Sequence, residues 1–132
     1  MKSQLIPPQS KKGKYRQQLG RLGEELAVRY LESHDYRLVT RNFKARYGEI
    51  DLIALDKNIL VFLEVKTRIG RKFGRPEEAI TPRKLREVIL TARYYKMLHP
   101  ELPEAMRIDV IGIELDFDHT LKSFNHILNV TL

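Results

Sequence analysis

The sequence contains no cysteine and no tryptophan, and it has no apolar stretch near the ~18 residues that would cross a bilayer. The absence of cysteine excludes a disulfide scaffold, a thiolate zinc site and a cysteine nucleophile. The stretch from Met1 to Pro8 has no apolar run of the length found in signal peptides. These absences predict a cytoplasmic protein with no membrane partner.

Acidic residues are outnumbered by basic ones, with 17 Asp plus Glu against 24 Lys plus Arg in 132 residues. The formal net charge of +7 favours a polyanionic partner, because lysine and arginine neutralise phosphates and release their counterions. The chain length suits one domain. Residues 1–14 combine prolines and lysines without an apolar period, so we expect a flexible basic arm there and a single domain over residues 15–132.

Apolar periodicity predicts elements in the order α-β-β-β-α-β-β. The first helix is expected from Tyr15 to about Ser33, and the second begins after Thr81-Pro82, an N-cap followed by proline at the first helical position. Tyr94 and Tyr95 of the second helix are expected at the edge of the core, with a base-stacking platform as the less favoured alternative. The strands are expected at residues 36–42, 49–55, 59–66, 107–115 and 121–130. This order predicts a mixed α/β domain with helices flanking a sheet.

Two strong strand patterns separated by a short polar turn predict a hairpin with Lys57-Asn58 at its tip. In that register Asp51 lies opposite Glu64, and Glu49 lies opposite Lys66. Side chains alternate along a strand, so all four project from one face of the sheet. Two carboxylates directly opposite each other destabilise a sheet unless a cation compensates their charge.

A divalent metal could supply that cation, since Mg²⁺ or Mn²⁺ takes carboxylates, waters and substrate phosphate as ligands. Asp51 and Glu64 would then be ligands, with the backbone carbonyl of Val65 as a further one. Lys66 would lie beside a metal-bound water, and Glu24 of the first helix could help hold the metal or position the nucleophile. The alternative is an ordinary ion pair of Glu64 with Lys66, worth ~0–1 kcal/mol.

The segment after the Glu64 strand is rich in glycine and basic residues. One interpretation is a loop that contacts phosphates, with Phe73 free to stack on a base. The alternative is a solvated loop with Phe73 in the core. A basic cluster at the start of the second helix is open to the same two interpretations, phosphate contact or plain surface charge. The residues assigned to nucleic-acid binding are Arg68, Arg71, Lys72, Arg75 and Lys84.

These residues resemble the Asp…Glu-x-Lys core of the restriction-endonuclease-like, or PD-(D/E)xK, nuclease superfamily. The blocks 48–53 and 62–68, with Gly23-Glu24 in the first helix, resemble more closely the YraN-like family of that superfamily. The resemblance covers about residues 15–130. It implies a restriction-endonuclease-like mixed sheet flanked by helices, similar to that of Holliday-junction resolvases. Ile50 stands where the superfamily often has proline.

The resemblance also implies roles for single residues. Asp51 and Glu64 would be the metal ligands, Lys66 the catalytic lysine and Glu24 an acid carried by the helix. The leading interpretation is therefore a Mg²⁺- or Mn²⁺-dependent endonuclease acting on DNA, including branched or otherwise structured DNA. By the same resemblance, cleavage would leave a 5′-phosphate and a 3′-hydroxyl.

Two alternatives come from other functional classes. The first is a nucleic-acid-binding protein that keeps the fold and the basic surface without cutting. The second is a scaffold protein whose acidic residues are all salt-bridged, which predicts no affinity for DNA at physiological salt. A homodimer is also an open expectation, because branched-DNA resolvases cut two strands symmetrically.

Overall fold

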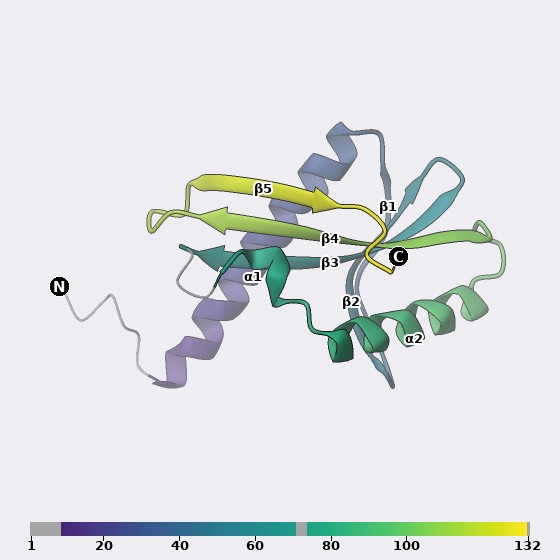
Figure 1. The fold of residues 1–132 in the computed structure, drawn as a ribbon, viewed down its shortest axis with the longest axis horizontal. Helices are drawn as coiled ribbons and strands as arrows, with labels where there is room; N and C mark the ends of the chain where they lie inside the picture. Colours follow the sequence, from purple (N-terminus) through teal and green to yellow (C-terminus); the bar gives the residue numbers. More distant parts are fainter. Residues whose placement is uncertain (1–8, 71–73, 132) are drawn as a thin grey trace.

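A computed structural model describes residues 9–70 and 74–131. Its elements follow the predicted order, with a short 3-10 helix, η2, added before the second helix (Figure 1). Their bounds are α1 Gln9–Ser33, β1 Arg37–Ala45, β2 Gly48–Asp56, β3 Ile59–Ile69, η2 Pro76–Ala79, α2 Pro82–Leu98, β4 Ala105–Leu115 and β5 Leu121–Ile127.

The start of α1 corrects the predicted boundary of the N-terminal arm. Residues 9–14 were assigned to the arm because they show no apolar period, but they form the first turns of α1. A polar helix needs no such period, and lysine and glutamine are good helix formers. The rest of the arm, residues 1–8, lies outside the described residues.

The strands form one sheet in the order β1-β2-β3-β4-β5. Neighbouring strands are antiparallel except β3 and β4, which run parallel because η2 and α2 carry the chain back across one face. At the centre, residues 60–63 of β3 are fully buried on both faces, which explains their continuous apolar run. The mixed α/β fold is confirmed.

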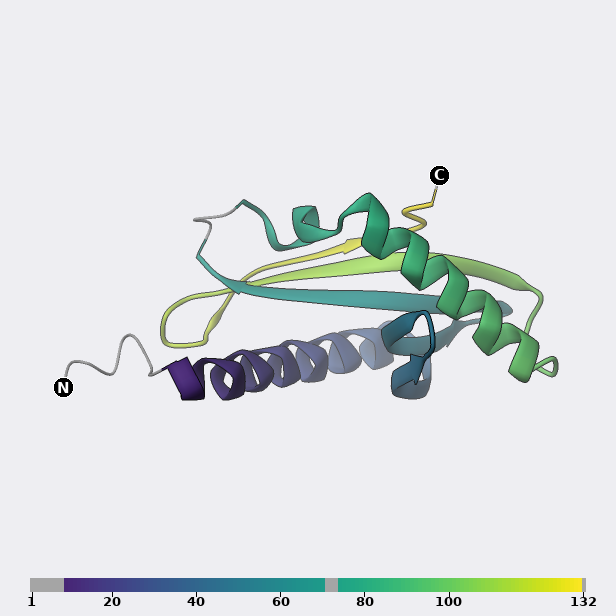
Figure 2. The ribbon, with the colours of Figure 1, turned by 90° about the horizontal axis from the view of Figure 1, so that it is seen from below.

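The two long helices cover opposite faces of the sheet (Figure 2). The core is accordingly divided into two halves. The α1 half includes Ala27, Leu31, Leu52 and Leu63. The α2 half includes Ile53, Phe62, Val88 and Tyr95. Neither helix, over its described residues, carries an apolar stretch sufficient to cross a membrane.

A buried polar network fastens the start of β4 to its neighbours. Asp109 accepts hydrogen bonds from both Arg107 Nε, at 3.1 Å, and the ring of His126, at 2.8 Å. The Arg107 guanidinium also contacts Asp56 at the end of β2, and Tyr30 of α1 bonds the other ring nitrogen of His126. These groups hydrogen-bond one another, so the network connects α1, β2, β4 and β5, and His126 has a structural role.

Gly23 sets the distance between α1 and the sheet. A Cβ atom at this position would overlap Thr67 Oγ1 of β3, a buried atom with no hydrogen-bond partner among the described residues. Glycine therefore permits the close approach, at a helix-propensity cost of up to ~1 kcal/mol relative to alanine. The next acidic residue of α1, Glu24, depends on this approach for its position.

We expect Gly23→Ala to destabilise the protein by roughly 1–3 kcal/mol, because the added methyl group overpacks the contact with Thr67. Gly20→Ala is the matched control, since a Cβ there meets nothing within 4 Å and should stabilise α1. Urea denaturation of both variants checks the prediction. Equal stability changes for the two glycines would contradict it, and Thr67→Ala should relieve part of the Gly23→Ala defect.

Candidate functional site

The β2–β3 hairpin has the predicted register over its paired part. The Cα partners run from Asp56 opposite Ile59 to Leu52 opposite Leu63. Beyond Leu52 the side chain of Asp51 takes over, because its carboxylate accepts a hydrogen bond of 2.8 Å from the N–H of Val65. The strands therefore separate at the acidic end of the hairpin.

This separation brings Asp51 and Glu64 together as side chains rather than as a ladder pair. Their carboxyl groups lie within hydrogen-bonding reach of each other, provided that one of them carries a proton. The pairing of β2 with β3 ends at Leu52 and Leu63, so the predicted opposition of Glu49 and Lys66 is wrong; on its other side Glu49 lies opposite Lys44 of β1. At Glu49 and Ile50, β2 is paired with β1 alone, whereas from Leu52 to Leu55 it has partners on both sides.

The pKa of Glu64 is raised to about 7. Burial is the largest cause, and the negative charge of Asp51 is the second. The Glu64 residue is only 4% exposed. Burial also raises the pKa of Asp51, although the hydrogen bond from Val65 opposes that shift. Without a cation, the raised pKa values favour a proton on the acid pair near neutral pH.

Two lysines approach the same oxygen of Glu64. Lys66 Nζ lies 3.5 Å from Glu64 Oε2, and Lys84 Nζ lies 3.6 Å from it. Lys84 reaches the sheet from the first turn of α2, where its N–H is held by the Thr81 side chain at 3.1 Å. Lys84 was assigned only to nucleic-acid binding; the structure places it against the acid pair.

The other oxygen, Glu64 Oε1, is buried and has no hydrogen-bond partner among the described residues. A buried carboxylate oxygen left without a donor is a position that a cation can fill. Within residues 9–70 and 74–131, no group of three or more His, Cys, Asp or Glu side chains is arranged to hold a metal ion. Mg²⁺, however, needs only one or two protein carboxylates when water and phosphate complete its shell. Asp51 and Glu64 fit that requirement.

Glu24 lies on the α1 side of the pair. Asn42 of β1 donates a hydrogen bond of 3.4 Å to its carboxylate. Burial raises the pKa of Glu24, and the charge of Asp51 adds to the shift. The predicted acid of the first helix, Glu24, therefore lies close enough to Asp51 to feel its charge.

Asn42 is the residue near the site that sequence reasoning missed. It adopts a positive φ of 53° inside β1, a conformation that asparagine tolerates better than most residues. The strand was expected to end at Asn42, a residue type in which strands are depleted, but β1 continues to Ala45.

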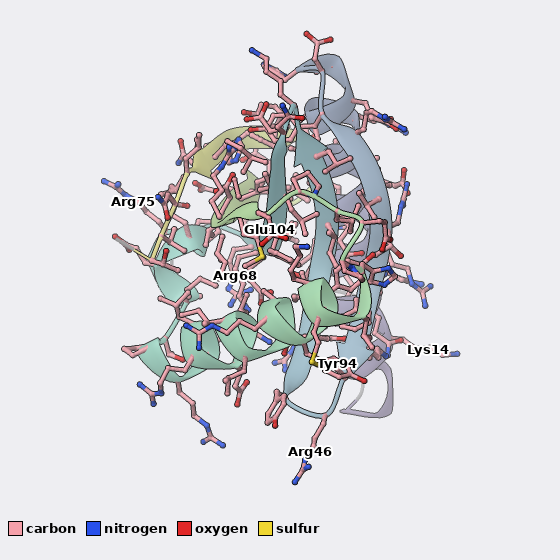
Figure 3. All side chains as sticks on the ribbon, turned by 90° about the vertical axis from the view of Figure 1, so that its right-hand side faces the viewer. Lys14, Arg46, Arg68, Arg75, Tyr94 and Glu104 are labelled. Carbon is pink, nitrogen blue, oxygen red and sulfur yellow. The ribbon has the colours of Figure 1, made fainter. Side chains whose placement is uncertain are left out.

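The predicted nucleic-acid-binding residues are distributed differently. Arg68 follows Glu64 and Lys66 at alternate positions of β3, so it shares their face of the sheet, and its guanidinium donates to the Thr67 carbonyl. Arg75 is exposed beside η2 and points outward (Figure 3). Arg71, Lys72 and Phe73 lie outside the described residues.

The raised pKa of Glu64 predicts how stability depends on pH in the metal-free protein. The folded state binds this proton more tightly than the unfolded chain, whose pKa is near 4.5. The stabilisation is therefore complete below about pH 4.5 and is lost as the pH rises through about 7. We expect Glu64→Gln to lack this loss, and to gain roughly 1–3 kcal/mol over the wild type between about pH 5 and pH 8.

Urea denaturation in EDTA at about pH 5 and about pH 8 measures this difference in the free energy of unfolding. Glu104→Gln is the control, because the Glu104 side chain is 92% exposed and its removal should leave the pH dependence unchanged. Parallel pH profiles for wild type and Glu64→Gln would contradict the prediction.

Comparison with known proteins identifies the family. The sequence pattern of the family described as "Uncharacterised protein family UPF0102" matches residues 23–113. The chain belongs to this family. The matched range contains the acid pair, both lysines that contact it and Glu24.

Individual relatives support this membership. A UPF0102 protein of Leifsonia xyli subsp. xyli is 50% identical over 97 residues, which cover 73% of this chain and 81% of the relative. A UPF0102 protein of Syntrophomonas wolfei subsp. wolfei is 43% identical over 112 residues, covering 85% and 96% of the two chains. One from Caldanaerobacter subterraneus subsp. tengcongensis is 41% identical over 112 residues, covering 84% and 92%.

Proposed function

We propose that this UPF0102 protein is a metal-dependent endonuclease that hydrolyses phosphodiester bonds in DNA, with Mg²⁺ or Mn²⁺ as its cofactor. One observation carries the proposal: half-buried Asp51 lies beside buried Glu64, and one oxygen of Glu64 faces two lysines while the other has no donor among the described residues. A purely structural pair would be disfavoured, since burying ionisable side chains costs more than burying an apolar pair of the same size.

Each side chain of the site would have its own role in the reaction. Asp51 and Glu64 would hold the cation, and the Val65 carbonyl stays a predicted further ligand. When bound, the cation would supply a Lewis acid and lower the pKa of water. The ammonium groups of Lys66 and Lys84 would stabilise the negative charge that develops on the phosphate. Glu24, whose pKa is raised, would accept a proton from the attacking water.

The proposed reaction is hydrolysis and needs no other reactant. Water forms the new bond to phosphorus, the bond from phosphorus to the 3′ oxygen breaks, and a proton passes to that oxygen. The products are a 5′-phosphate and a 3′-hydroxyl, as the superfamily resemblance implies.

The fold supports the same proposal at a coarser level. A five-stranded mixed sheet with helices on both faces, and with acids at the point where β2 leaves β3, suits the restriction-endonuclease-like topology. We include that topology in the proposal. The net charge of +7 and the lysines and Arg68 on the acid face suit a polyanionic substrate.

Cleavage of labelled linear, flapped and four-way-junction DNA tests the proposal. We expect cutting with Mg²⁺ or Mn²⁺ but not with EDTA, and a loss of at least ~100-fold in Asp51→Asn, because the variant removes one ligand while keeping the side-chain shape. Glu104→Gln, an exposed acid away from the pair, should cut as the wild type does.

Two results would overturn the proposal. Cutting that survives Asp51→Asn would place the activity elsewhere or in a contaminant. Salt-sensitive DNA binding without cutting of any substrate would favour the alternative of a non-catalytic nucleic-acid-binding protein with this fold.

A further inference from the structure

An aromatic groove of about 500 Å³ lies between the β1–β2 turn and the C-terminal half of α2. Tyr47 and Tyr94 are its exposed rings, at 46% and 37%. Figure 3 shows Arg46 at the tip of the turn and Tyr94 on α2, on the same side of the molecule. The expectation that Tyr94 and Tyr95 lie at the core edge is thus confirmed for buried Tyr95, whereas Tyr94 opens onto this groove.

The rings of the groove are held by their neighbours. Phe43 stacks against Tyr94, with centroids 6.4 Å apart and planes 29° from parallel, and meets Tyr95 edge-on at 4.8 Å. The guanidinium carbon of Arg46 lies 5.9 Å from the centroid of Tyr47. The aromatic surface is therefore fixed from below by the α2 half of the core.

The lining combines two chemistries. Aromatic faces and the exposed Met97 offer stacking and apolar contact, and no lining residue is acidic. Arg46 supplies positive charge, whereas Lys44, also in the lining, lies opposite Glu49 of β2. An apolar ligand alone would gain nothing from the cations, and a phosphate alone would gain nothing from the rings. A nucleotide presents both groups, a flat base and an anionic phosphate.

The groove lies on the same side of the sheet as the acid pair. From Tyr47 to Asp51 the chain runs four residues along an extended strand, or roughly 13 Å. From Lys84, which contacts Glu64, to Tyr94 it runs ten residues along α2, or roughly 15 Å. These two path lengths set an upper limit on each separation, which corresponds to about four stacked nucleotides at ~3.4 Å each.

We infer that this groove binds unpaired nucleobases of the strand whose phosphodiester bond the acid pair cleaves. The inference rests on the proposed function and narrows its substrate to nucleic acid with a single-stranded segment near the cut. A base inside a duplex exposes only its edge, whereas stacking on Tyr47 or Tyr94 requires a free face.

A second copy of the chain is the competing occupant, because α2 exposes apolar residues at helical spacing, Leu90, Tyr94, Met97 and Leu98. Charge disfavours it. A two-fold contact through the groove would bring Lys44 and Arg46 of each copy close to those of the other, and like charges oppose association.

The test measures binding to a short DNA duplex carrying a single-stranded tail with a fluorescent purine analogue, and to the same duplex with blunt ends. All proteins carry Asp51→Asn so that the strand stays intact. We expect Tyr94→Leu and Tyr47→Ala each to weaken binding of the tailed duplex about 10-fold and to reduce quenching of the analogue, with blunt-duplex affinity unchanged. Tyr15→Leu is the matched control, since Tyr15 is 38% exposed on α1.

Equal affinities for the tailed duplex in all variants would overturn the inference, as would a dimer in sedimentation velocity that Tyr94→Leu dissociates. A tail made of RNA shows whether the groove requires deoxyribose. Failure of the proposed function gives a different pattern. If the protein with Asp51 intact binds the tailed duplex through the groove but cuts no substrate, only the proposed cleavage is overturned. Cleavage of tailed DNA that is insensitive to Tyr94→Leu overturns the groove alone.

Discussion

The candidate site depends on one hydrogen bond, from the N–H of Val65 to the carboxylate of Asp51. It replaces the backbone ladder at the point where β2 and β3 separate, so the end of the hairpin is satisfied by a side chain. This hydrogen bond holds the Asp51 carboxylate beside Glu64, although both carboxyl groups lose hydration there. Without this bond, Asp51 would extend toward solvent and Glu64 would be an ordinary buried acid with two lysine partners.

The two helices complete the site from opposite faces of the sheet. Gly23 lets α1 approach Thr67 closely, and Glu24 then lies within the field of Asp51. Thr81 fixes the first turn of α2, from which Lys84 reaches Glu64. The site therefore assembles only when both helices pack, and the two halves of the core supply the free energy that holds the carboxylates together.

Much of this arrangement could be predicted because strands have a period of two. Once the turn at Lys57-Asn58 was placed, the register from Asp56 to Leu52 followed, and Asp51 necessarily approached Glu64. The end of the β2–β3 pairing at Leu52, which removes the opposition of Glu49 and Lys66, could not be predicted in the same way, since no local pattern in the sequence marks it. Contacts between helix and sheet, such as Lys84 with Glu64, depend on tertiary packing that leaves no local pattern in the sequence.

The groove beside Tyr94 was missed for a related reason. A helical stripe of apolar residues predicts burial, and Tyr95 is buried as that pattern requires. Which of two adjacent tyrosines faces the β1–β2 turn is decided by the angle at which α2 crosses the sheet. Only the assembled structure relates Tyr94 to Phe43 and Arg46, residues far away in the sequence.

The central claim is that Asp51 and Glu64 form a cation site, and calorimetric titration of the protein with Mg²⁺ and Mn²⁺ in the absence of DNA tests it most directly. The account predicts one saturable site that Asp51→Asn and Glu64→Gln each abolish, with affinity falling as the pH drops below about 7, because the metal must displace the proton of Glu64. Metal binding that persists unchanged in both variants, or no binding by the wild type at any pH where it is folded, would contradict it.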